Sequence, residues 1–408
     1  MIRKHCNPSR RGKAAALSLL LTLTTGTAVF ADARFDKWVH GFWPQAKQAG
    51  ISVSLYNDAF RGLKPDPHVL KLAEKQPEFV TPIWDYVEKR VSKTRIENGQ
   101  EKLKEWNRWI ARIERTYGVD RHIFVSIWGL ETAYGAVLQN KKIVRNNIRS
   151  LSTLAYGDRR RGKYAKRQLI ETLKIVQNGE VALSDMTGSW AGAMGHTQFI
   201  PTTYQAYAVD IDGDGRRNVW TSVPDALASA AAYLKASGWE AGKTWGYEVK
   251  LPRGFNYSHA DSKKKRPLSE WAKLGIKRAG GKAFPRPSDM GRLYLPAGAR
   301  GPAFVMLKNF DVIKRYNNSN AYALAVGHLA DRLRGGGTFA TNWSKDYRPL
   351  SRKQIKQLQS RLNQRGYKAG TVDGKAGPGT RGAIRAFQRS AGLVPDGQPA
   401  VDVLQRLN

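Results

Sequence analysis

The sequence has very little cysteine and comparatively few acidic residues. Its one cysteine, Cys6, precedes an uncharged apolar run. A chain processed after that run has no cysteine, which excludes disulfide bonds and thiolate chemistry. The chain has 33 Asp and Glu residues against 68 Lys and Arg, a formal net charge of +35 over 408 residues. This excess favours an anionic partner, such as nucleic acid, an acidic membrane face or an acidic polymer.

The apolar run near the N-terminus, residues 14–30, is short for a membrane span and has no stop-transfer pattern after it. A positively charged segment from Arg3 to Lys13 precedes it, and small-residue cleavage sites follow near Ala31 and Ala33. We therefore expect residues 1–31 to be a signal peptide and the mature protein to be periplasmic, with no membrane span. Export argues against nucleic acid as a partner.

The rest of the chain predicts a folded, mainly helical protein. Hydrophobic residues make up 41% of it and there are twelve Trp residues, enough for a sizeable core. Apolar residues recur at helical spacing as far as Ser237 and again over 321–333, whereas glycines, prolines and basic residues interrupt the pattern between Trp239 and Pro302. We predict a mainly α (α+β) domain over 32–335 with a small β-containing insertion. A linker over 336–350 and a small three-helix domain over 351–408 follow.

For two stretches before residue 120 we make more specific predictions. Lys102 to Tyr117 has a strong apolar stripe, and we predict one continuous amphipathic helix there. Trp84 to Val91 shows no clear period, and we predict a mixed segment.

One carboxylate, Glu131, stands inside an apolar helical pattern. Ile127 and Leu130 belong to the apolar face of this helix, and Gly135 is a plausible stop. Partial burial and the negative end of the helix dipole both disfavour an ionised carboxylate, so they raise its pKa. A Glu in this position can donate a proton near neutral pH. An exposed helix end, or a pair with a nearby Arg, is the alternative reading.

Four segments together resemble a known enzyme family. They are Trp-Gly-Leu-Glu-Thr-Ala-Tyr-Gly at 128–135, the glycine-dense stretch 188–204, the Asp-rich stretch 210–220, and Tyr-Asn-Asn-Ser at 316–319. In this order they resemble the lytic murein transglycosylases of the B type, exported enzymes that cut bacterial peptidoglycan. The tail over 357–397 resembles a three-helix peptidoglycan-binding module.

The resemblance implies a lysozyme-like catalytic domain in which Glu131 is the one catalytic carboxylate. Glu131 would protonate the glycosidic oxygen and then take the proton of the C6 hydroxyl of the muramic acid, whose oxygen closes on C1. The product would be a 1,6-anhydro sugar, and the substrate N-acetyl group would stabilise the intermediate. Peptidoglycan glycan strands would be the partner, with cell-wall synthesis or division proteins as further candidates.

The resemblance also assigns substrate-binding positions. Ser189 and Gln198 match residues that touch the substrate or the catalytic Glu, although a structural turn is the alternative for the glycine-dense stretch that holds them. His196 falls in the same stretch, where we expect a cleft-wall or surface residue without a catalytic role.

Three tyrosines match cleft aromatics of the family, namely Tyr86, Tyr233 and Tyr316. A tyrosine can lie against a sugar face and still form a hydrogen bond. Asn317 would orient the N-acetyl group or the Glu. An ordinary core tyrosine remains the alternative for Tyr86 and Tyr233.

Residues 210–216 have the start of an EF-hand-like loop. Asp210, Asp212 and Asp214 alternate, a Gly permits the sharp turn, and Arg216 would offer its backbone carbonyl. The closing Glu of the usual loop is missing, and Asp225 is the candidate in its place. We weigh a structural calcium against a turn held by Asx hydrogen bonds. The chemistry itself requires no cofactor.

Other functions stay open on the sequence alone. A hydrolytic muramidase of the same fold would need a second carboxylate to activate water, for which Asp185 is the candidate. A non-catalytic wall-binding protein would not need Glu131. A basic nucleic-acid-binding protein would require an unprocessed cytoplasmic chain.

Overall fold

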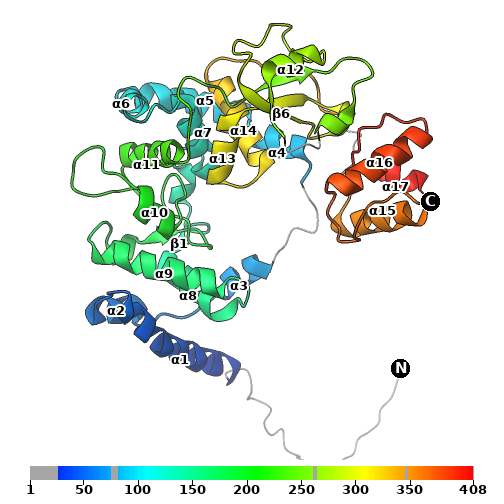
Figure 1. Ribbon diagram of the computed structural model, residues 1–408. Coiled ribbons are helices and arrows are strands. Elements are labelled where there is room, and N and C mark those ends of the chain that lie inside the picture. Colours follow the sequence, from blue (N-terminus) through cyan, green and yellow to red (C-terminus); the bar gives the residue numbers. More distant parts are fainter. Residues whose placement is uncertain (1–25, 75–80, 261–263, 345–347, 408) are drawn as a thin grey trace, which may run out of the picture.

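The computed structural model describes residues 26–74, 81–260, 264–344 and 348–407, so most of the expected signal peptide lies outside the described residues. None of the described helices combines the length and the apolar character that a membrane span needs. The helical domain has two lobes, each with its own apolar core, and a small sheet lies at one end of it (Figure 1).

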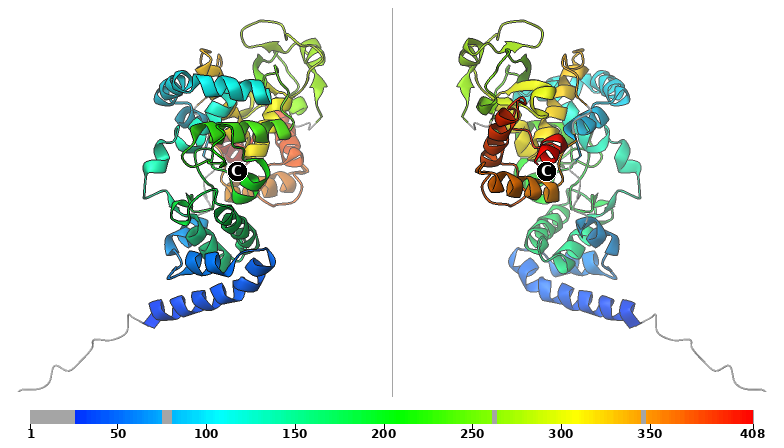
Figure 2. Two further views of the ribbon diagram at one scale, coloured as in Figure 1. Left: turned by 90° about the vertical axis from the view of Figure 1, so that its left-hand side faces the viewer. Right: turned by 90° about the vertical axis from the view of Figure 1, so that its right-hand side faces the viewer.

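The first lobe is built around Phe42, Leu151, Leu169 and Phe199. Helices α8 and α9 pack against each other, and α1 extends from the end of this lobe (Figure 2). The helices of this lobe are α1 (Gly26–Gln48), α2 (Val53–Phe60), α3 (Pro67–Glu74), α8 (Asn147–Gly157), α9 (Gly162–Gln177) and α10 (Pro201–Tyr207).

The second lobe is built around two helices with almost no exposed residues on their inner faces, α7 (Arg121–Thr132) and α14 (Asn320–Leu333). These two helices pack directly on each other, and α4 packs on α14. The remaining helices of the lobe are α4 (Ile83–Arg90), α5 (Lys93–Glu105), α6 (Asn107–Tyr117), α11 (Val223–Ala236) and α13 (Lys308–Tyr316).

Two helix predictions were wrong in their boundaries. The stretch from Lys102 to Tyr117 is not one helix, because the chain bends at Trp106, between α5 and α6. Residues 84–90 are not a mixed segment but belong to helix α4, which buries Val87 in the core of this lobe and Trp84 in that of the C-terminal helices. Neither stretch contains a Gly or Pro that would signal the change.

The predicted β-containing insertion is confirmed as a five-stranded antiparallel sheet of order β4-β6-β7-β3-β5. Val249, Leu293 and Val305 form its core with Trp271 of α12 (Leu268–Lys273). Its strands are β3 (Gly246–Lys250), β4 (Arg266–Pro267), β5 (Lys277–Arg278), β6 (Met290–Tyr294) and β7 (Ala303–Met306). A separate pair joins β1 (Arg145–Asn146) and β2 (Thr187–Gly188). Short 3₁₀ turns are η1 (Ala136–Gln139), η2 (Leu183–Asp185), η3 (Tyr257–Ala260) and η4 (Gly298–Arg300).

The C-terminal helices are α15 (Arg352–Gln364), α16 (Pro378–Ser390) and α17 (Val401–Arg406), three as predicted. Their apolar core also includes Trp84 of α4 and Ala297. The backbone N–H of Ala299 donates to Asp396 at 3.0 Å. This small domain therefore packs on the larger one.

The segment between the domains, predicted as a linker, follows the surface of the larger domain over its described part. The ring of Phe339 stacks on His328 with centroids 3.8 Å apart, and Trp343 packs against Phe339. The N–H groups of Ala340 and Thr341 donate to Glu248, each at 2.8 Å.

Gly327 is where α14 approaches the sheet most closely, since a Cβ there would lie 2.6 Å from the ring of Trp245. We expect Gly327→Ala to lower the free energy of unfolding by about 1–3 kcal/mol, the usual cost of overpacking. This loss outweighs the better helix propensity of Ala. Urea unfolding followed by circular dichroism measures the change.

Gly41→Ala is the matched control. Gly41 lies in α1, and a Cβ added there would meet no other atom within 4 Å, so the same substitution should raise stability by about 0.5–1 kcal/mol. A Gly327→Ala protein as stable as the Gly41→Ala protein would contradict the packing described for α14.

Candidate active site

Glu131 lies in the last turn of α7. The helix begins at an N-cap, Asp120, whose carboxylate accepts the N–H of His122 at 2.9 Å. It ends at Thr132, three residues before the expected stop at Gly135, because Ala133 already adopts a left-handed conformation with φ 50°. Tyr134 is also left-handed, with φ 59°. Two such residues in succession store strain next to Glu131.

Two arginines bind the C-terminal end of α7. Arg95 donates from Nε to the carbonyl of Gly129 at 3.0 Å, and Arg90 donates to the carbonyl of Leu130 at 3.1 Å. A guanidinium group at this end of a helix opposes its negative dipole. The dipole, which we expected to raise the pKa of Glu131, is therefore largely offset at this helix end.

Burial is the main influence on Glu131. It raises the pKa of the carboxyl group to about 7, against the opposing effects of a hydrogen bond from Tyr322 and the charge of Arg90. The Tyr322 hydroxyl donates to Oε1 of Glu131 at 2.7 Å. Since that bond occupies Oε1, Oε2 is the oxygen left to carry a proton. The group is thus divided between its protonated and ionised forms near neutral pH.

The tyrosines expected at the site surround this carboxylate. The negative charge of Glu131 helps to raise the pKa of both Tyr86 and Tyr316, which places both rings near it. Tyr233 joins the group through Tyr316, with ring centroids 5.3 Å apart in an edge-to-face arrangement. Tyr233 and Tyr316 pack against both apolar cores, so they lie where the two lobes meet.

The glycine-dense segment is bonded to both sides of this group. Thr132 of α7 donates to the carbonyl of His196 at 2.7 Å, and Tyr316 donates to the carbonyl of Thr197 at 2.6 Å. Gly195, with φ 65°, contacts the backbone of Val219 so closely that a side chain could not fit. The segment therefore holds α7 and α13 at a set distance.

Ser189 and Gln198 lie in this segment and support its turns. The Ser189 hydroxyl accepts the N–H of Ala193 at 3.0 Å, and Gln198 donates to the carbonyl of Gly195 at 3.0 Å. Gln198 has a left-handed backbone, φ 54°. Within the described chain neither side chain bonds to Glu131.

His196 contacts α7, where its Nδ1 accepts the indole N–H of Trp128 at 3.0 Å. Burial lowers its pKa to about 4, so the ring is neutral. Asn317 is exposed at the end of α13, adjacent to Tyr316. Asp185 is exposed in η2 and does not contribute to the environment of Glu131.

Sequence reasoning missed Tyr322 and the two arginines. Tyr322 stands in an apolar helical pattern, where it reads as a core residue, and a Glu more than 190 positions away offers no signal. Arg90 and Arg95 look like solvated charges beside many others.

The four predicted aspartates do come together. Ligand atoms of Asp210, Asp212, Asp214 and Asp225 lie within 4.8 Å of one another. Asp225 is fully buried and accepts the N–H groups of Ile211 and Asn218, each at 2.9 Å. Burial raises its pKa to about 6, and the charge of Asp212 adds to this.

This arrangement suits a hard cation. It offers several carboxylate oxygens, and a divalent ion would relieve their mutual repulsion. Arg216 is exposed, with its N–H bonded to Asp214 at 2.8 Å. Arg217 pairs with Glu180 rather than with the aspartates.

Comparisons with known proteins agree with this fold and site. Residues 34–331 match the family described as the transglycosylase SLT domain, and residues 351–407 match a peptidoglycan-binding domain. The membrane-bound lytic murein transglycosylase B of Escherichia coli is 32% identical over 313 residues, 74% of this chain and 81% of that protein. The chain belongs to the transglycosylase SLT family of lytic transglycosylases.

Solved structures are similar over the same range and beyond. SltB3 from Pseudomonas aeruginosa, solved with NAG-anhNAM-pentapeptide, matches at 48% identity and a TM-score of 0.86, over 91% of this chain and 99% of that one. Slt35 from Escherichia coli, solved with calcium, matches at 27% identity and a TM-score of 0.60, over 74% and 93%. The predicted lysozyme-like fold is confirmed.

Removing the Tyr322 hydroxyl tests the environment of Glu131. Tyr322→Phe deletes a hydrogen bond that favours the ionised carboxylate, so the pKa of Glu131 should rise above its value of about 7. Carbon-detected NMR titration of the Glu131 carboxyl measures the shift.

Tyr316→Phe is the control, because the Tyr316 hydroxyl bonds to the carbonyl of Thr197 and not to Glu131. It should leave the pKa of Glu131 close to the wild-type value. A fall in the pKa of Glu131 in Tyr322→Phe, or an equal rise in both variants, would show that the hydroxyl does not act as described.

Proposed function

We propose that this protein cleaves the MurNAc-GlcNAc β-1,4 bond of peptidoglycan without water and leaves 1,6-anhydro-MurNAc ends. The observation that carries the proposal is the environment of Glu131: one buried carboxyl group whose pKa burial raises to about 7, with a hydrogen bond from Tyr322 on Oε1. Among the described residues, Tyr322 and Arg90 are the groups that oppose the effect of burial, and no second carboxylate acts on it.

Glu131 acts first as an acid and then as a base. In its protonated form it gives the Oε2 proton to the glycosidic oxygen as the bond to C1 breaks. The substrate N-acetyl group stabilises the positive charge at C1. The Glu131 carboxylate then takes the proton of the C6 hydroxyl, whose oxygen bonds to C1. One proton enters and one leaves, so Glu131 returns to its starting form.

The surrounding residues hold the sugar and the acid. In this proposal Tyr86, Tyr233 and Tyr316 contact sugar faces, which their closeness to Glu131 and to one another supports. Ser189 and Gln198 shape the segment that joins α7 and α13, and Asn317 is available to the acetamido group. The names of the relatives support this substrate, since SltB3 was solved with a sugar-peptide of this class.

The C-terminal helices bind the wall in this proposal, in keeping with the family match of residues 351–407. We place the mature protein in the periplasm, where peptidoglycan lies, after removal of residues 1–31. Cell-wall synthesis or division proteins as partners stay a prediction.

Replacing the proposed acid should abolish the reaction. Glu131→Gln removes the transferable proton, and turnover of peptidoglycan should fall about 10²–10⁴-fold or more. Wild-type turnover should itself decline as the pH rises above about 7, because the ionised form cannot donate. Mass spectrometry of released fragments measures both turnover and product.

Glu101→Gln, on the exposed side of α5, is the matched control and should keep full activity. Fragments that are one water heavier than the anhydro products would instead identify a hydrolase. Unchanged lysis by Glu131→Gln would rule out the assignment of the acid.

We further propose that the aspartate cluster holds a structural calcium ion. Asp210, Asp212, Asp214 and Asp225 would supply carboxylate oxygens and Arg216 its carbonyl, and the ion would neutralise the cluster, including the buried Asp225. The calcium complex of Slt35 supports this proposal. The ion would stabilise the loop between α10 and α11 and would take no part in bond cleavage.

Calcium should therefore raise the melting temperature of the full-length protein. At a calcium concentration a hundred times its Kd, the free energy of unfolding should exceed that of the protein in chelator by about 2.7 kcal/mol. Asp212→Asn with Asp214→Asn, both at exposed positions, should remove the gain, whereas the exposed Asp36→Asn should keep it. Calorimetry with and without chelator measures the melting temperatures. If calcium raised the melting temperature equally in both variants, the site would be excluded.

A further inference from the structure

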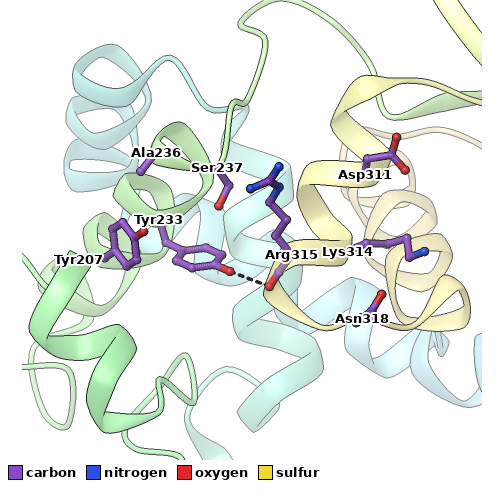
Figure 3. Close-up of a pocket in the computed structure, with 8 residues that line it drawn as sticks. All are labelled: Tyr207, Tyr233, Ala236, Ser237, Asp311, Lys314, Arg315 and Asn318. Carbon is purple, nitrogen blue, oxygen red and sulfur yellow. Dashed lines mark hydrogen bonds between the residues drawn. The ribbon is translucent and has the colours of Figure 1, made fainter. Parts of the chain in front are cut away.

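A pocket lies beside Tyr233, one of the tyrosines grouped near Glu131. It has a volume of about 490 Å³ and lies between the end of α11 and helix α13 (Figure 3). Tyr207, Tyr233 and Ser237 line one side, and Asp311, Lys314 and Asn318 line the other. In Figure 3 the guanidinium group of Arg315 reaches between these two sides, toward Ser237.

The charge of this pocket is mostly positive. Of the described residues that line it, Asp311 is the one acidic side chain, and both of its oxygens are taken, by Arg292 at 2.6 Å and Lys265 at 2.9 Å. Arg315 forms no hydrogen bond or ion pair from its side chain within the described part of the chain. Lys314 is partly buried, and burial together with the charge of Arg292 lowers its pKa, against the opposing charge of Asp311. As far as the chain is described, these two cations line the pocket without an ion pair.

The pocket is linked to the proposed active site by contacts of Tyr233, which lines it. The Tyr233 hydroxyl donates to the backbone carbonyl of Arg315 at 2.6 Å, and the Tyr233 ring contacts Tyr316, which lies near Glu131. Tyr233 and Tyr316 therefore form a chain of contacts from Arg315 to the surroundings of Glu131. The volume exceeds what a small ion needs and suits a short peptide segment.

We infer that this pocket binds a carboxylate of the peptide stem that peptidoglycan carries, with Arg315 as the main contact and Lys314 as a supporting charge. An arginine presents a planar pair of N–H donors that matches a carboxylate. The inference rests on the proposed function and adds to it a preference, namely that peptide-bearing glycan strands bind better than peptide-free strands. The contact lies outside the reacting atoms, so it acts on binding and not on the chemical step.

The test compares two substrates with the full-length protein. One is glycan strands with their peptide stems, and the other is the same strands after an amidase has removed the peptides. The variant is Arg315→Gln with Lys314→Gln, which leaves the backbone bond to Tyr233 in place. The matched control is Arg253→Gln with Lys273→Gln, which removes the same charge from exposed positions on the sheet domain.

We expect kcat/KM of the pocket variant to fall about tenfold on peptide-bearing strands, through KM, and less than twofold on peptide-free strands. The control variant should match wild type on both. An equal fall on both substrates, or no fall on peptide-bearing strands, would overturn the inference. If wild type releases no anhydro products from either substrate, the proposed function fails instead. Calorimetric binding of the free stem peptide to wild type and to the pocket variant then decides the role of the pocket alone.

Discussion

The buried carboxylate of Glu131 is the constraint on which the rest of the structure depends. A carboxyl group that keeps its proton near pH 7 must be removed from water, and burial does this at the end of α7. A buried carboxyl group also needs a partner, and Tyr322 supplies one hydrogen bond from α14. Helices α7 and α14 therefore have to pack closely, which explains why both are mostly buried.

The C-terminal end of α7 poses a second problem, because a helix that stops beside a buried carboxyl group leaves carbonyls without partners. Arg90 and Arg95 meet this need from α4 and α5. Thr132 anchors the same turn to the glycine-dense segment. Arrangements that look unrelated in the chain thus serve one end of one helix.

Much of the fold follows from the sequence because it depends on local patterns. Apolar periodicity placed α7, α11, α14 and the three C-terminal helices, and the alternating aspartates marked their cluster. Local patterns could not place the bend at Trp106, since no Gly or Pro marks it and packing decides it. They also could not assign Tyr322, whose role depends on one contact between distant helices. Ser189 and Gln198 were expected at the site from family resemblance, and the structure adds that their side chains bond to nearby backbone.

Helix α4 contacts both the C-terminal domain and the end of α7. Its Trp84 belongs to the core of the C-terminal domain, while its Arg90 bonds to the last turn of α7. The two domains are therefore joined through a shared helix as well as through the chain. A polymer held by the small domain, as proposed, would then differ from one on a loose tether, whose local concentration falls off with linker length. If the small domain holds the polymer as proposed, pulling on that polymer would load α4, the helix whose Arg90 bonds to the last turn of α7.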